Sequence, residues 1–131
     1  MGETFQTIQT SKDIEFFLDQ TNELHDGDLI GVQYIHNGHT GGNPHYVNPK
    51  LSELRMRYMV TSIDDAIVEL VFSSLVEWQV KDNSFEITDT AVSIDENGFV
   101  IWTDDCSTAA EVRKNGSYVI AEKMQWRFVD A

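Results

Sequence analysis

The stretch LRMRYMVTSIDDAIVELVF, residues 54–72, decides the fold. Its first seven residues alternate as a half-buried strand does, with inward side chains expected at Leu54, Met56, Tyr58 and Val60. Residues 62–65 form a turn, and Ala66–Phe72 returns as the partner strand. The stretch therefore predicts an antiparallel hairpin, across which an arginine faces Glu69 in a surface ion pair worth well under about 1 kcal/mol.

A helix is predicted before this hairpin, from Ser11 to Leu24, because apolar residues recur there at near-helical spacing. Thr10 or Ser11 can cap its first turn, in which acidic side chains are favoured by the helix dipole. Gly27 lies where a left-handed residue that ends a helix is expected.

Five further segments are strand-like: 29–36, 76–80, 85–94, 99–103 and 118–129. In the last of them Glu122 interrupts an apolar face, which indicates a bulge or a buried partner for its carboxylate. Short connections favour antiparallel neighbours, because parallel strands need long crossovers. We expect an α+β fold in which one N-terminal helix packs on a twisted, mainly antiparallel sheet of about seven strands, a sheet that can curl into a half-barrel.

Length and composition predict one domain over residues 1–131, with no transmembrane segment and no secretion signal. The single cysteine, Cys106, excludes an internal disulfide. We therefore expect a cytoplasmic protein.

The charge is strongly negative, because 22 acidic residues oppose 9 basic ones and give a net charge of −13. Such a field repels phosphate backbones and attracts basic proteins, so a basic protein partner is expected and a nucleic acid or membrane partner is not. The candidate partner-facing residues are Asp89, Asp95, Glu96, Asp104, Asp105 and Glu111. The alternative is that this charge serves solubility alone.

The four histidines fall within residues 25–45 and supply the alternative function. Two or three of His36, His39 and His45, with Asp26 or Asp28 reaching across, could hold Zn²⁺ or Ni²⁺ in a site with an open position. Their spacing matches no zinc signature, and the alternative is that they are polar loop residues without shared geometry. No cofactor is expected outside this metal hypothesis.

The segment Leu24–Ile30 contains the tripeptide His25-Asp26-Gly27, which we call the step. Its expected role is structural, because it makes the turn from the helix into the next strand. With its surroundings, the segment resembles a group of small bacterial proteins that carry a Leu/Phe-His-Asp step after a short helix, followed by antiparallel strands. Some members are assigned as immunity proteins that bind and block a toxin. The group commonly has Ser or Ala where this chain has Gly27, and residues 37–50 do not map onto it. The resemblance implies binding rather than catalysis, and it carries over no catalytic residue.

The sequence therefore predicts a non-enzymatic protein–protein interaction module, of the kind that an immunity-type inhibitor of a basic toxin would be. The alternative is a metal-binding module or metal-dependent hydrolase that uses the loop with His36, His39 and His45. The sequence leaves the oligomeric state open.

Overall fold

The computed structural model describes residues 4–36, 52–81, 90–104 and 116–129. The elements follow one another as β1 (Gln6–Ile8), α1 (Ser11–Gln20), the short turn η1 (Asn22–Leu24), β2 (Gly27–His36), β3 (Ser52–Val60), the short turn η3 (Thr61–Ile63), β4 (Ala66–Gln79), β5 (Ala91–Ile94), β6 (Val100–Thr103) and β7 (Tyr118–Val129). The strands form one seven-stranded sheet in the order β2-β3-β4-β7-β6-β5, with β1 paired to β7, and every pairing is antiparallel. The predicted α+β class is confirmed.

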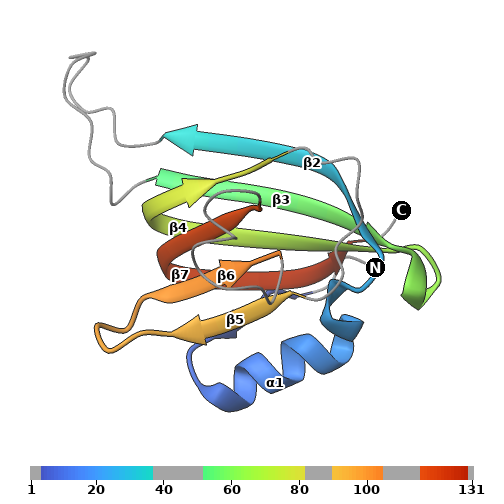
Figure 1. Ribbon diagram of the computed structural model, residues 1–131, viewed down its shortest axis with the longest axis horizontal. Coiled ribbons are helices and arrows are strands. Elements are labelled where there is room, and N and C mark those ends of the chain that lie inside the picture. The colour runs from blue at the N-terminus through green and yellow to red at the C-terminus, as the bar shows by residue number, and fades with distance from the viewer. Residues whose placement is uncertain (1–3, 37–51, 82–89, 105–115, 130–131) are drawn as a thin grey trace.

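The sheet curls into a half-barrel around one apolar core (Figure 1). Trp102 on β6 lies 6.0 Å from Tyr58 on β3, measured between ring centroids, although β7 and β4 stand between these two strands in the sheet. Only strong curvature brings such distant strands together. We call the concave side the inner face and the convex side the outer face.

Helix α1 closes the β5 side of the half-barrel, while β2 borders the other side (Figure 1). Of the two predicted capping residues, Thr10 is the cap, and it forms a capping box with Asp13. The ring centroids of Phe17 and Trp126 lie 5.4 Å apart. The helix ends at Gln20, earlier than the predicted Leu24. No helix among the described residues is long and apolar enough to cross a membrane.

A left-handed turn connects α1 to β2 and explains the early end of the helix. Asn22, Glu23 and Leu24 have φ angles of 52°, 57° and 53°. Left-handed backbone costs an L-residue about 1–2 kcal/mol. Burial of Leu24 offsets this cost, as does a 2.9 Å hydrogen bond that the Thr90 amide donates to the Glu23 carbonyl.

Position 27 requires glycine because there is no room for a Cβ atom, and not because the backbone is left-handed there. This corrects the sequence interpretation. The left-handed residue next to it is Asp26, with a φ of 61°. A Cβ atom on Gly27 would lie 2.7 Å from the carbonyl oxygen of Leu24. The tight approach of β2 to the left-handed turn therefore admits no side chain at this position.

Strand β4 is one strand over Ala66–Gln79, whereas the sequence indicated two separate segments. Ser74 joins them with a φ of 58°, and the register with β7 shifts between Leu75 and Glu77. These irregularities let the second half of β4 turn back over the inner face (Figure 1).

The alternation of buried and exposed side chains along β7 is interrupted in the middle of the strand. Ala121 and Met124 are both fully buried, and the two residues between them, Glu122 and Lys123, are exposed. Of the two alternatives for Glu122, a bulge-like irregularity fits this pattern and a buried carboxylate does not.

The two glycines of β2 provide a matched test of this packing. We expect Gly27→Ala to lower the free energy of unfolding by about 1–3 kcal/mol, because its Cβ has to displace backbone. Gly31→Ala should change it by less than about 0.5 kcal/mol, because the nearest atom to that Cβ, Cβ of Arg57, is 3.9 Å away. Urea denaturation of both variants measures the difference, and equal effects would contradict this account of Gly27.

Candidate functional site

Strand β2 forms one border of the sheet and has no second partner strand among the described residues. It is 10 residues long, and the run from Gly31 to Ile35 pairs regularly with β3 on one side only. The opposite border, β5, has 4 residues and lies against α1. A long border strand exposes a row of backbone hydrogen-bond donors and acceptors. Proteins usually keep such strands short, place charged side chains on them or cover them. Helix α1 therefore protects the β5 border, whereas no described strand or helix pairs with the outer edge of β2.

An apolar patch accompanies this border on the inner face. We define the β2 patch as Ile30, Val32, Tyr34 and Trp78, whose exposed fractions are 51%, 45%, 44% and 37%. The rings of Tyr34 and Trp78 stack 5.3 Å apart, because the bent end of β4 reaches β2 there. Next to them lies a hollow of about 450 Å³ lined by Leu29, Ile30, Gly31, Val32, Trp78 and Val80. Aromatic and aliphatic side chains around a hollow are typical of the anchoring centre of a protein interface.

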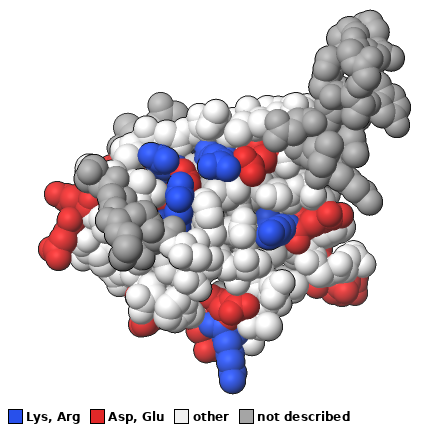
Figure 2. All heavy atoms as spheres, turned by 180° about the vertical axis from the view of Figure 1, so that it is seen from behind, with Lys and Arg blue, Asp and Glu red and all other residues white. Residues whose placement is uncertain are grey.

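The start of β2 lies at an acidic end of the sheet. The Thr61 amide and hydroxyl donate to the carbonyl of Asp26, and the Ser62 hydroxyl donates to the carbonyl of His25. These bonds hold the turn between β3 and β4 beside the start of β2. The acidic end consists of Glu23, Asp26, Asp28, Asp64 and Asp65, and neither segment 22–28 nor segment 61–65 contains a lysine or arginine. Acidic side chains gather at this end in Figure 2 as well.

The outer face carries a row of ion pairs across three strands. Arg57 on β3, Glu69 on β4 and Arg127 on β7 stand directly opposite one another in the ladder. Nε of Arg57 donates to Oε2 of Glu69 at 2.8 Å, and Nε of Arg127 donates to Oε1 at 2.9 Å. The Glu69 side chain is only 2% exposed. The predicted pairing is thus confirmed for Arg57, but Glu69 is buried rather than on the surface, and it pairs with a second arginine, Arg127.

The protonation of Glu69 follows from this geometry. Burial works to raise the pKa of its carboxyl, but the hydrogen bonds and charges of Arg57 and Arg127 outweigh burial and hold the pKa below its usual range. Glu69 is therefore an ionised structural residue at neutral pH.

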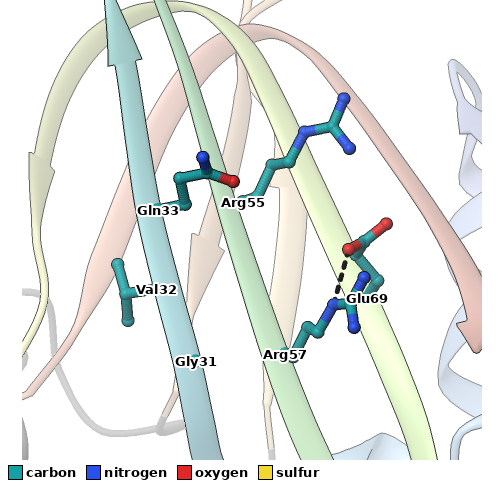
Figure 3. A pocket seen from close by; sticks show the side chains of 6 residues that line it. All are labelled: Gly31, Val32, Gln33, Arg55, Arg57 and Glu69. Atoms are coloured by element: carbon teal, nitrogen blue, oxygen red, sulfur yellow. Dashed lines mark hydrogen bonds and ion pairs between the residues drawn. The ribbon is translucent and has the colours of Figure 1, made fainter. Parts of the chain in front are cut away.

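Beside this row lies a hollow of about 250 Å³ lined by Gly31, Val32, Gln33, Arg55, Arg57 and Glu69 (Figure 3). Arg55 is held by Glu53 on its own strand, with 2.8 Å between Nε and Oε2. Basic side chains cluster over the middle of this face in Figure 2, and four of the six lysines and arginines of the described residues lie on it: Arg55, Arg57, Lys123 and Arg127. The acidic character of the chain is therefore concentrated elsewhere, including the acidic end.

Three of the acidic residues predicted to face a partner are described, and two of them have structural roles. The carboxylate of Asp95 accepts hydrogen bonds from the amides of Asn97 and Phe99, both at 2.9 Å, and so shapes the turn from β5 to β6. Asp104 accepts from the amide of Ser117 at 3.0 Å and ties the end of β6 to the start of β7. Glu96 is exposed in the turn from β5 to β6. Asp89, Asp105 and Glu111 lie outside the described residues.

The predicted metal ligands are only partly described. His36 and Asp28 stand near opposite ends of β2, eight positions apart, which is about 26 Å along an extended strand. The structure therefore does not bring these two residues together. His39 and His45 lie outside the described residues, and within the described ranges no group of three or more His, Cys, Asp or Glu side chains could hold a metal ion.

The His25-Asp26-Gly27 step makes the connection that the sequence indicated. Nε2 of His25 lies 3.6 Å from Oδ1 of Asp26, with both side chains nearly half exposed. Since backbone atoms of His25 and Asp26 accept the hydrogen bonds from η3, the step anchors the start of β2.

Tyr58 is a buried phenol of the inner face. Burial, with a smaller contribution from the charge of Asp104, raises the pKa of its hydroxyl. Tyr58 therefore stays protonated at neutral pH and is a core residue.

Sequence reasoning missed the β2 patch. Its only signal was that LIGVQYI, residues 29–35, is apolar on both faces, a pattern equally typical of a strand buried on both sides.

The chain matches no protein-family model, no curated protein and no solved structure.

The row around Glu69 predicts a specific dependence of stability on pH. At pH 7, Glu69→Gln should lower the free energy of unfolding by about 2 kcal/mol, because two charge-assisted hydrogen bonds are weakened in a buried place. A carboxyl whose pKa is lowered by folding stabilises the protein above its unfolded pKa, about 4.3, and this contribution is lost as the pH falls through the folded value. The gap between the variant and the wild type should therefore be constant above about pH 4.3 and shrink below it.

Denaturation with guanidinium at a series of pH values measures this gap. Glu53→Gln is the control, because the Arg55–Glu53 pair lies along one strand near the surface and should contribute less than about 1 kcal/mol. A gap that does not depend on pH, or a Glu53→Gln effect as large as that of Glu69→Gln, would contradict the assigned role.

Proposed function

We propose that this chain is a non-enzymatic protein-binding domain that masks a basic protein partner, as an immunity-type inhibitor masks a toxin. The observation that carries the proposal is the β2 patch, which combines a stacked Tyr34–Trp78 pair with exposed Ile30 and Val32. The patch lies beside a strand border that pairs with no other described strand.

The energetics of the patch support a binding role. Full burial of a large apolar side chain contributes about 1.5–3 kcal/mol, so covering these half-exposed side chains makes roughly 1 kcal/mol each available to an interface. Tyrosine and tryptophan are enriched among the residues that dominate binding energy, partly because few of their torsions have to be fixed.

The charge supports a basic partner. The net charge is −13, and the acidic end adjoins the start of β2. Opposite charge raises the rate of encounter, while the apolar patch supplies contacts that slow dissociation. The resemblance to immunity proteins agrees with this division of roles and suggests a toxin as the partner.

The proposal is tested by comparing how well two alanine variants, Trp78→Ala and Val76→Ala, retain the partner. Trp78→Ala should lose a partner that wild-type protein retains from an extract of its source cells, with affinity reduced by about thirtyfold, which corresponds to about 2 kcal/mol at an interface centre. Val76→Ala is the control, because Val76 is 55% exposed in the same half of β4 but lies outside the patch. Circular dichroism establishes that both variants are folded.

The association rate of the purified pair should also fall by at least about tenfold between low and high ionic strength. A partner that both variants retain equally would refute the role of the patch. A rate that ignores salt would refute the charge argument.

A further inference from the structure

We propose that β2 receives its partner by strand addition: an extended segment of another protein pairs with the open border of β2, antiparallel to it, with its basic end on the acidic end of the sheet. This inference rests on the proposed function, and it adds the mode of binding and the chemistry of the bound segment.

The border of β2 has the features of an acceptor strand. Residues 29–35 contain no charged residue and no proline, and charge or proline is what commonly prevents the pairing of a border strand. The shift in register between Leu29 and Gly31 interrupts only the first part of the strand, and from Gly31 onward the pairing to β3 is regular. A regular run of this length can form a ladder with an incoming backbone.

The two ends of the border differ in chemistry, and this difference gives the segment a direction. The side chains of Val32 and Tyr34 follow the start of the strand at alternate positions on the inner face, so the middle of the segment should be apolar at alternate positions. At the start of the strand stand Asp26 and Asp28, with Asp64 and Asp65 in the neighbouring turn. In an antiparallel arrangement the C-terminal end of the segment meets these carboxylates, so lysine or arginine is expected there.

Charge also decides between a foreign segment and a second copy of this chain. A second copy would bring another net charge of −13 and would repeat the acidic end, since paired β2 strands of two copies place each acidic end near the border of the other. The residues from 22 to 36 contain no lysine or arginine that could compensate. A basic segment of another protein fits the border, and a second copy does not.

The test uses defined peptides as probes with the intact protein. The probe is a peptide of about ten residues in which valine alternates with threonine and whose C-terminal end carries three lysines. N-methyl groups on alternate residues leave it one pairing edge, so that it cannot assemble with itself. The matched peptides carry three glutamates in place of the lysines, carry the lysines at the N-terminal end, or have every amide methylated.

Amide hydrogen exchange, followed by NMR, reports on the border. The lysine-ended peptide should slow exchange at least tenfold at those amides of residues 29–36 that point away from β3, and the glutamate-ended and fully methylated peptides should not. The peptide with lysines at its N-terminal end should bind at least threefold more weakly. Val32→Lys should abolish the slowing, while Val76→Lys, the same substitution at an exposed valine outside β2, should retain it.

Several outcomes would overturn strand addition. The first is that no peptide slows amide exchange in β2, and the second is that the lysine-ended and glutamate-ended peptides slow it equally. The third is that, in the unbound protein, the outward amides of β2 already exchange as slowly as those of β4. That result would mean that the chain covers its own border. Slowing that depends on protein concentration without peptide would assign the border to a second copy. If these results appear while Trp78→Ala still loses its protein partner, strand addition fails and the proposed function stands; if the peptide adds to β2 but no partner depends on Trp78, the proposed function fails instead.

Discussion

The carboxylate of Glu69 is the point on which the sheet depends. It lies on β4, between the guanidinium groups of Arg57 on β3 and Arg127 on β7, and it is almost completely buried on the outer face. A slip by one residue in either ladder would move this charge to the apolar inner face and separate it from both arginines. The row therefore fixes the register of three strands at once. The inner face follows from that register, because Tyr58, Phe72 and Trp102 meet in the core only when β3, β4 and β7 are aligned in this way.

The curvature of the sheet has two consequences that belong together. It encloses the core around Trp102 and lets α1 and β5 close one side of the half-barrel. At the other side, the described residues cover the inner face of β2 only in part, so Val32 and Tyr34 remain half exposed although they follow the core pattern. The bend of β4 at Ser74 then brings Trp78 onto Tyr34. The same geometry that encloses the core thus leaves an apolar surface beside the border of the sheet, where we propose that another protein binds.

Particular residues show which features could be predicted from the sequence and which could not. The hairpin from 54 to 72 was predicted correctly because period-two alternation is a local signal that sheet pairing preserves. The end of α1 was placed too late, because the left-handed turn at Asn22–Leu24 is stabilised by burial of Leu24 and by a bond from Thr90, which is distant in the sequence. Gly27 was given a left-handed role, whereas a carbonyl from the preceding turn excludes a Cβ atom there. Asp95 and Asp104 were predicted to face a partner, and the structure adds that both accept hydrogen bonds from backbone amides of turns. The metal hypothesis grouped His36 with Asp28, which stands near the other end of the same strand.

The sequence by itself determined the class of the fold, the antiparallel order of the hairpins and the strongly acidic character, because alternation, turn residues and charge are properties of neighbouring residues. Only the tertiary structure decided which strand lies at an open border, which charges are buried and which apolar side chains stay exposed. Those properties depend on contacts between segments distant in the chain. An apolar strand such as LIGVQYI reads the same in a covered sheet as at an open border, and the physical difference is whether another layer lies over it.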